Sequence, residues 1–131
     1  VIDNRARQFV SIDPNWPAAM IPLSTVFKTI LERGGAIAMV LRDDQHNYQF
    51  VERVRPLTNA FSDRFKIHLS PDFHEKGLIG DDFALSGSMN FTHRGLEVND
   101  EHVVYRTDSA TVSGRLLTLQ ALWGAKLDAQ P

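Results

Sequence analysis

The chain has 131 residues with 16 acidic and 14 basic side chains and a formal net charge of -2, so we expect one domain over residues 1–131 and no coating of DNA by bulk charge alone. Hydrophobic residues make up 43% of the sequence, which is too many for a disordered segment. The absence of cysteine excludes disulfides, zinc–thiolate sites, iron–sulfur clusters and a thiol nucleophile, and it fits the cytoplasmic location that we expect.

The first third of the chain is predicted to form a strand, a helix and a second strand. Polar and apolar residues alternate over Arg7–Asp13, which predicts a short strand, and Trp16 after it is predicted to pack in the interior rather than line a cleft. Apolar residues recur at helical spacing over Leu23–Leu31, and Gly34-Gly35 ends that helix. The apolar run Ala36–Leu41 predicts a strand buried on both faces.

The rest of the chain continues the alternation of helices and strands. A helix is predicted over Asn47–Phe61 with a break or kink at Pro56, and Phe65–Leu69 predicts a strand with one polar face. The remaining predicted elements are a hairpin of Phe73–Ile79 and Phe83–Ser86, a strand over His102–Arg106, and a helix capped by Thr107 or Asp108 with Val112, Leu116, Leu119 and Trp123 on one face. This order predicts an α/β sandwich, with a mixed sheet between two helix layers.

The candidate chemical site is the stretch His74–Asp81 together with Gly87-Ser88-Met89-Asn90. On a strand, the side chains of His74 and Lys76 leave the same face about 6–7 Å apart. An imidazole beside a permanent cation suits attack on a phosphodiester, because the cation offsets the charge of the non-bridging oxygens. A short helix predicted over Met89–His93 would add backbone N–H groups, the Ser88 hydroxyl and the Asn90 amide to the same anion site.

These residues resemble the motif of the phospholipase D superfamily, which is His-x-Lys, four residues, Asp, and then Gly-Ser-x-Asn. His74, Lys76 and Asp81 match the spacing of the first part, and the gap from Asp81 to Gly87 is one residue shorter than the commonest spacing in the family. The resemblance covers essentially the whole chain. It implies a phospholipase D-like α/β/α sandwich, a mixed β-sheet flanked by helices on both faces, and a reaction that needs no metal and no cofactor.

The resemblance also implies a role for each residue. His74 would form a phosphohistidine or protonate the leaving oxygen, and Glu101 would accept a proton from its far ring nitrogen. Asp81 would order the site, with Asp82 as the alternative if the hairpin register shifts by one residue. The phosphate-binding residues would be Lys76, Ser88 and Asn90, and the candidate substrate contacts are His93, Arg94 and His68. From the residues alone, Ser88 and Asn90 also fit turn and helix-cap positions, and Glu101 also fits a surface charge.

Family members use two such motifs, whereas this chain has one. We therefore expect a homodimer with a shared active site, or one half of a longer chain, which Val1 as first residue leaves open. The single motif and the continuation Asn90-Phe91-Thr92 resemble the nuclease branch, which makes DNA or RNA the expected substrate. The alternatives are a phospholipase or phosphatidyltransferase of the same superfamily, and a catalytically silent domain that binds nucleic acid. No apolar run approaches the ~18 residues of a membrane span.

Overall fold

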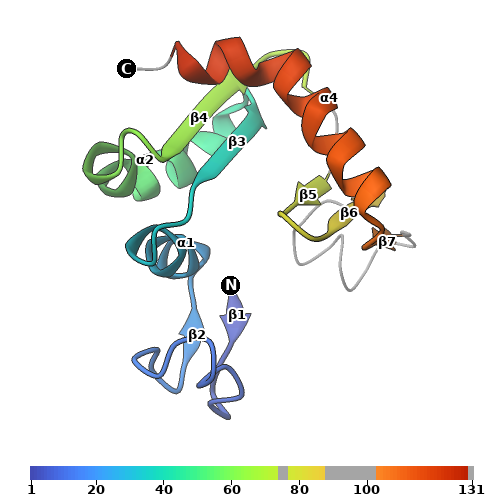
Figure 1. Ribbon diagram of the computed structural model, residues 1–131. Coiled ribbons are helices and arrows are strands. Elements are labelled where there is room, and N and C mark those ends of the chain that lie inside the picture. The colour runs from blue at the N-terminus through green and yellow to red at the C-terminus, as the bar shows by residue number, and fades with distance from the viewer. Residues whose placement is uncertain (74–76, 88–102, 130–131) are drawn as a thin grey trace. The chain divides into compact units, whose positions relative to one another are not determined.

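The computed structural model describes residues 1–73, 77–87 and 103–129. Its helices are interspersed with short strands along the chain (Figure 1). They divide into two compact units, Val1–Pro71 and Asp72–Ala129, which are called here the first and the second unit. Each unit is described by itself, and a single domain over residues 1–131 stays a prediction.

The first unit begins with two short strands that the sequence did not predict. β1 (Ile2–Asp3) pairs antiparallel with β2 (Met20–Ile21). The strand predicted over Arg7–Asp13 is wrong, because this segment forms successive turns in the structure. Its backbone groups bond locally, as in the bonds from the Arg7 N–H to the Asn4 carbonyl at 2.9 Å and from the Asp13 N–H to the Phe9 carbonyl at 3.1 Å.

The side chain of Asn4 explains why turns replace the strand. Asn4 is 1% exposed; its amide donates to the Pro17 carbonyl at 2.8 Å and its oxygen accepts from the Phe9 N–H at 3.2 Å. Hydrogen bonds from an asparagine side chain to the backbone compete with the backbone hydrogen bonds between strands. The alternation of polar and apolar residues does not reveal this competition. The loop therefore closes around a buried amide instead of extending.

A buried chain of hydrogen bonds joins this loop to the first helix, α1 (Leu23–Glu32). The Trp16 indole N–H donates to the Thr29 hydroxyl at 2.9 Å, and that hydroxyl donates to the Asp13 carboxylate at 2.9 Å. Trp16 is 5% exposed, so the prediction that it packs in the interior is confirmed. Bonds from the Asn15 N–H and from Thr29 lower the pKa of Asp13.

Thr29→Val is expected to destabilise the first unit by about 1–3 kcal/mol, because it leaves the buried Trp16 N–H without an acceptor. The lowered pKa of Asp13 means that its contribution to stability is complete above the unfolded-state pKa and is lost as the pH falls through the folded value. The variant should therefore also lose part of the stability that the wild type gives up on acidification. Urea unfolding followed by tryptophan fluorescence at pH 7 and below pH 4 measures both effects; equal stability of the two chains at pH 7 would contradict the role of this bond.

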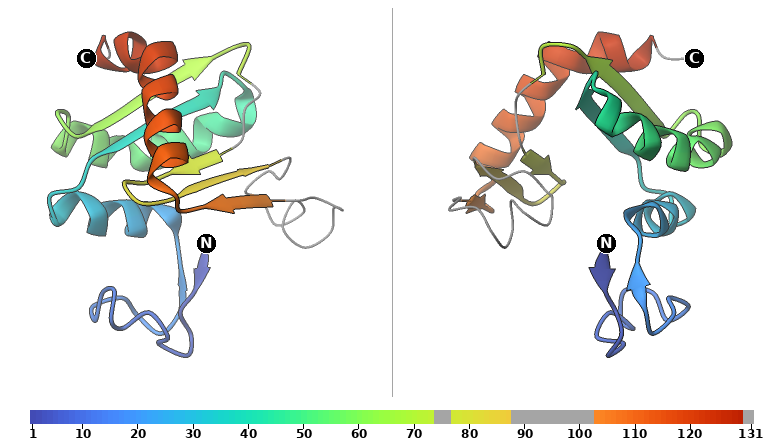
Figure 2. Two further views of the ribbon diagram at one scale, coloured as in Figure 1. Left: turned by 45° about the vertical axis from the view of Figure 1, so that its right-hand side comes forward. Right: turned by 180° about the vertical axis from the view of Figure 1, so that it is seen from behind.

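The rest of the first unit is a strand–helix–strand unit. β3 (Ile37–Arg42) and β4 (Phe65–Ser70) are parallel, in a register that pairs Ile37 with Phe65 and Arg42 with Ser70. α2 (Gln45–Ala60) connects them, as a parallel pair requires. The core of the unit is Leu31, Val54 and Phe65, which are at most 2% exposed. The helix α2 lies beside the β3-β4 pair (Figure 2). Partly buried apolar side chains surround the core: Phe27, Ile37, Met39, Phe50, Leu57, Phe61 and Ile67.

Arg64, the residue before β4, fixes the end of α1. Its guanidinium donates from Nη1 to the carbonyls of Leu31 at 2.7 Å and Gly35 at 3.0 Å, and its own carbonyl accepts from the Ile37 N–H at 2.7 Å. The last carbonyls of a helix have no partner within the helix, and a cation also interacts favourably with that end of the helix dipole. One side chain therefore holds the end of α1 and the start of β3 beside β4.

Two details of this unit differ from the expectation, although both elements are confirmed. α2 runs through Pro56 without a break, because packing of its apolar face against the core outweighs the one hydrogen bond that proline removes; a kink at Pro56 stays a prediction. β3 is not buried on both faces. Ile37 and Met39 pack on the core, whereas Ala38 on the other face is exposed.

The second unit contains an antiparallel sheet and a long helix. The sheet has the order β5-β6-β7, formed by β5 (Gly77–Ile79), β6 (Ala84–Gly87) and β7 (Val103–Arg106). The predicted hairpin and the following strand are thereby confirmed within the described residues. α4 (Ser109–Asp128) packs on β5 and β6, and Ala84 is 3% exposed.

The start and the apolar face of α4 follow the sequence prediction. Asp108 is the N-cap and accepts from the Thr111 N–H at 3.0 Å; bonds from Thr111 and then from Arg106 lower its pKa to about 2. On the predicted apolar face, Val112 is buried and the Trp123 ring meets Phe73 edge-on at 5.5 Å. Leu117 on the opposite face is exposed.

The structure thus confirms a mixed α/β chain. Among the described residues the strands form three small sheets, β1-β2, β3-β4 and β5-β6-β7. A single mixed sheet with helices on both faces stays a prediction. Of the helices in the described ranges, none combines the length and the hydropathy needed to cross a membrane.

Candidate functional site

Most of the predicted site residues lie outside the described residues, and nothing is said here of their structure. These are His74, Lys76, Ser88, Asn90, His93, Arg94 and Glu101. The short helix predicted over Met89–His93 also lies outside them. The structure places Asp81, the alternative Asp82 and His68, together with the strands that lead into and out of the motif.

The sheet of the second unit brings three strand ends that border the motif to one end. Gly77 begins β5, Gly87 ends β6 and Val103 begins β7. The register pairs Gly77 with Ser86 and Gly87 with Val103, so these three strand ends lie at the same end of the sheet (Figure 1). The chain positions directly beyond them are Lys76, Ser88 and His102. Strand ends that are far apart in the sequence therefore lie side by side.

Asp81 and Asp82 lie at the opposite end of this sheet. They occupy the turn between β5 and β6, which the bond from the Gly80 N–H to the Phe83 carbonyl closes at 3.0 Å, and both side chains are exposed. Gly80 has no room for a side chain there, because a Cβ would approach the Phe83 ring to 2.3 Å. The structure does not bring either carboxylate to the strand ends at which the motif segments begin. An ordering role for Asp81 would therefore act through the hairpin.

His68 lies on β4 in the first unit and is half-buried. Its neighbour in the register is Val40 on β3, and Lys66 precedes it by two residues on the same face. The sequence prediction of one polar face for this strand is confirmed. Arg64, two residues before Lys66, was predicted to lie on the same face, but its guanidinium binds the Leu31 carbonyl at the end of α1.

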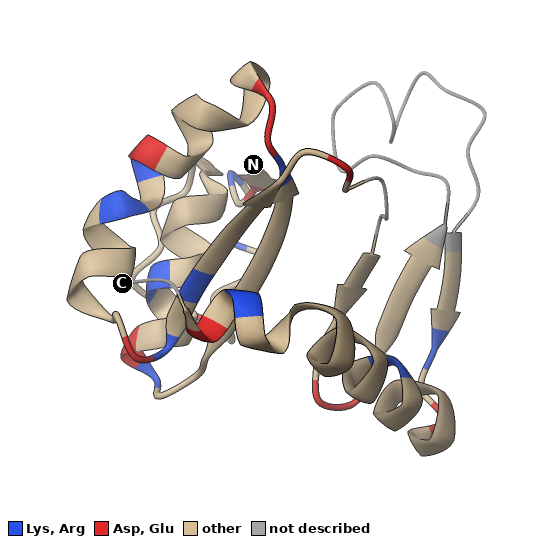
Figure 3. Cartoon of the chain, turned by 90° about the horizontal axis from the view of Figure 1, so that it is seen from above, with Lys and Arg blue, Asp and Glu red and all other residues tan. Residues whose placement is uncertain are grey.

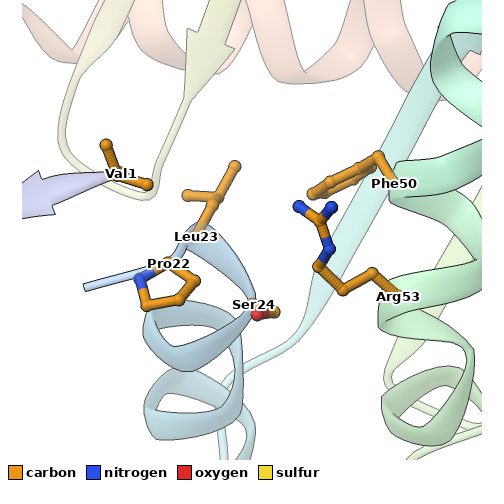
Figure 4. Close-up of a pocket in the computed structure, with 6 residues that line it drawn as sticks. All are labelled: Val1, Pro22, Leu23, Ser24, Phe50 and Arg53. Atoms are coloured by element: carbon orange, nitrogen blue, oxygen red, sulfur yellow. The ribbon is translucent and has the colours of Figure 1, made fainter. Parts of the chain in front are cut away.

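A small pocket of about 210 Å³ lies elsewhere in the first unit. The start of α1 supplies three of its lining residues, and Phe50 and Arg53 of α2 face them across the opening (Figure 4). The full lining is Val1, Pro22, Leu23, Ser24, Phe50 and Arg53. It includes none of the predicted site residues and no histidine or carboxylate, so it offers no general acid or base for the chemistry that the motif predicts.

Over residues 1–73, 77–87 and 103–129, no three His, Asp or Glu side chains are grouped in a way that could hold a metal ion. The lowered pKa of Asp3, about 2, comes from its hydrogen bonds with Arg5 and belongs to a surface pair. Asp108 owes its lowered pKa to the cap of α4. These shifts reflect local structure and do not mark a further site.

Comparison with known proteins decides the family. The model of a family described as "Cardiolipin synthase, PLD-like domain" matches residues 20–123, which is most of the sequence. The chain belongs to the PLD-like domain family. This confirms the relationship to the phospholipase D superfamily that was predicted from the His-x-Lys and Gly-Ser-x-Asn residues, and it places the protein in a superfamily of the phosphodiesterase type.

A solved structure also shares the fold of this PLD-like domain. The archaeal chromatin protein TrmBL2, whose report describes a novel mode of DNA binding, aligns with a TM-score of 0.57 at 15% sequence identity. The alignment covers 80% of this chain and 39% of that one, so the PLD-like domain described here spans well under half of TrmBL2. At this identity the likeness shows the fold alone. Among curated proteins, no sequence matches the chain.

Proposed function

We propose that this PLD-like protein is a metal-independent phosphodiesterase that cleaves DNA or RNA through a phosphohistidine on His74. The observation that carries the proposal is the register of β5, β6 and β7, which brings Gly77, Gly87 and Val103 to one end of a sheet. The sequence segments that adjoin these strand ends contain His74, Lys76, Ser88, Asn90 and Glu101. The match to the PLD-like family supports the reaction class.

In the proposed reaction, a ring nitrogen of His74 attacks phosphorus as the bond to the leaving oxygen breaks. The leaving oxygen takes a proton from a second histidine of the same kind, and water then hydrolyses the phosphorus–nitrogen bond. Lys76, Ser88 and Asn90 offset the charge on the phosphate oxygens. Glu101 accepts the proton of the far ring nitrogen of His74. Asp81 orders the hairpin that leads into the site.

The second histidine comes from a second copy of the chain in this proposal, with the active site on a two-fold axis. The single domain over residues 1–131 and the α/β/α sandwich around one mixed sheet belong to the same proposal. The supporting observation is the count of one His-x-Lys motif in a family whose chemistry uses two.

A shared active site predicts a defined mixing result. The active protein should sediment at twice the 14.8 kDa chain mass. If wild-type and His74→Ala chains are mixed in equal amounts and exchange freely, only about a quarter of the dimers should carry His74 in both chains. The mixture should then show about half the activity that its wild-type chains show when they are measured without the variant. An activity of the mixture equal to that of its wild-type chains alone would exclude a shared site, and so would activity in a monomer.

Two other functions are each favoured by one observation. The family description names cardiolipin synthase, which favours a phospholipase or phosphatidyltransferase. The structural neighbour is described as a DNA-binding chromatin protein, which favours a catalytically silent domain that binds nucleic acid.

Hydrolysis of single- and double-stranded DNA, RNA, cardiolipin and bis-p-nitrophenyl phosphate, each with and without EDTA, separates these functions. Cleavage of nucleic acid that survives EDTA supports the proposal, and cleavage of lipid alone supports the phospholipase. Binding of DNA without any turnover supports the silent domain. Activity that EDTA removes would contradict the metal-independent mechanism.

A further inference from the structure

The residue directly before the predicted nucleophile is tied to α4 by a contact between two rings. Phe73 precedes His74 in the sequence. Its ring meets the ring of Trp123 edge-on, with the centroids 5.5 Å apart and the planes at 83°. Aromatic pairs prefer this arrangement, because the positive edge of one ring approaches the negative face of the other. Both residues are half-buried and both belong to the second unit, so the contact lies within one compact unit.

The indole of Trp123 also contacts a cation of its own helix. The Lys126 ammonium lies over the ring, 5.1 Å from its centroid. The two residues are three apart and so are neighbours on the helix surface, and a cation over the face of an indole is attracted to it. α4 has only one other basic residue, Arg115, and its ribbon is mostly tan in Figure 3. Trp123 is therefore in contact with Phe73 and with Lys126.

The two motif residues His74 and Lys76 lie in the sequence between two residues that the structure fixes in the second unit. Gly77, the first residue of β5, is held by the pairing of β5 with β6. Phe73 is held by its ring contact with α4. Consecutive Cα atoms are only about 3.8 Å apart, so each motif residue adjoins one of these fixed residues. The position of Lys76 therefore depends on the sheet, whereas that of His74 depends on the ring contact.

We propose that Trp123 is a positioning residue for His74, because through Phe73 it fixes the backbone from which the imidazole attacks phosphorus. The inference rests on the proposed function in taking His74 as the nucleophile. In the strand predicted over Phe73–Ile79, neighbouring side chains leave on opposite faces. A ring at position 73 that packs on α4 would then turn the side chain at position 74 away from this helix. In this role Trp123 touches neither the substrate nor the reacting atoms.

The kinetic test compares Trp123→Leu, Trp123→Phe and Val112→Ala on bis-p-nitrophenyl phosphate. Leucine keeps an apolar side chain but removes the ring contact. The kcat of this variant should fall about 10- to 100-fold with KM nearly unchanged, since misplacement of a reacting group by about 1 Å has an effect of this size. Phenylalanine keeps a ring for Phe73 and should restore kcat to within about threefold.

Val112→Ala is the matched control on the same helix. Val112 is 2% exposed, and it lies about 16 Å before Trp123 along α4, close to the end of the sheet that holds Asp81. The control should lose stability and keep the wild-type kcat. Phe73→Leu should match Trp123→Leu, and the variant with both changes should lose no more kcat than either single variant, because both remove the same contact.

The NMR order parameter of the His74 backbone amide gives a readout that does not depend on turnover. It should lie near about 0.85 in the parent chain, as for a rigid backbone, and below about 0.6 in Trp123→Leu. Val112→Ala should leave it unchanged, and Trp123→Phe should keep most of the parent value.

Three results would overturn the positioning role. They are an unchanged order parameter in Trp123→Leu, equal losses of kcat in Trp123→Leu and Val112→Ala, and losses that multiply when Phe73→Leu and Trp123→Leu are combined. Wild-type kcat in Trp123→Leu beside an inactive His74→Ala chain would also overturn it and would leave the proposed function intact. If the wild type does not hydrolyse the ester, the proposed function is contradicted, and the order parameters still decide whether Trp123 holds the backbone at His74.

Discussion

Replacing His74 by alanine is expected to lower kcat/KM for phosphodiester hydrolysis by at least about 10³-fold, the upper part of the range for loss of a group that transfers protons or forms the covalent intermediate. No other histidine lies within the motif to take its place, since the nearest in sequence are His68 and His93. The loss should be equal with and without EDTA. Initial rates on bis-p-nitrophenyl phosphate and on the preferred nucleic acid measure it.

The matched control is His46→Ala, which removes an exposed imidazole from α2 in the first unit. This variant should keep the wild-type rate. Quenching the wild type during turnover in alkaline denaturant, in which a phosphorus–nitrogen bond survives, should also trap the phosphoryl group on the chain, and the His74→Ala chain should trap none. Wild-type rates in the His74→Ala chain would remove the core of the proposed mechanism.

Leu31→Ala is expected to give the largest loss of stability, about 2–5 kcal/mol. Leu31 is 0% exposed and packs with Val54 and Phe65 at the junction of α1, α2 and β4, so a smaller side chain leaves a cavity that rigid neighbours cannot close. Domains of this kind are stable by about 5–15 kcal/mol, and the change removes a large part of that. Urea unfolding followed by far-UV circular dichroism measures the free energy of unfolding.

Leu117→Ala provides the control for the same chemical change at the surface. Leu117 lies on the outer face of α4 and is 66% exposed, so its truncation should change the free energy of unfolding by no more than about 0.5 kcal/mol. A loss at Leu117 as large as at Leu31 would contradict the assignment of the core. A small loss at both would contradict the packing of α1 on α2 and β4.

Elements with a strong period could be predicted from the sequence. The apolar repeat over Leu23–Leu31 corresponds to α1, and the alternation over Phe65–Leu69 corresponds to β4, each within a residue or two. Their periods directly reflect which face is buried. Asp108 as the cap of α4 was predictable for a similar reason, because one side chain satisfies the first turn of a helix.

Elements fixed by contacts distant in sequence could not be predicted. The alternation over Arg7–Asp13 is overridden by Asn4, whose partners include Pro17, thirteen residues away. Pro56 remains inside α2 because the helix packs on a core that the local sequence does not reveal. Both cases are decided by tertiary contacts rather than by local preference.

The residue types and spacing of the candidate site could be predicted from the sequence, but their arrangement in space could not. The spacing of His74, Lys76 and Asp81 led to the superfamily, and the family comparison confirms that relationship. The sequence does not reveal that Asp81 lies at the far end of its sheet, because a hairpin turn reverses the chain between Gly80 and Phe83. Nor does it reveal that Arg42 stands level with Ser70, since only the register of a parallel pair brings them together.

The guanidinium of Arg64 has a mechanical consequence for the first unit. It joins the last turn of α1 to the residue directly before β4. The start of β4 therefore cannot shift without also releasing the end of α1 and the pairing of β3 at Ile37. These three pieces should open and close as one cooperative unit rather than fray separately. Loosening any one of them should therefore raise the amide hydrogen exchange of the other two by a similar factor.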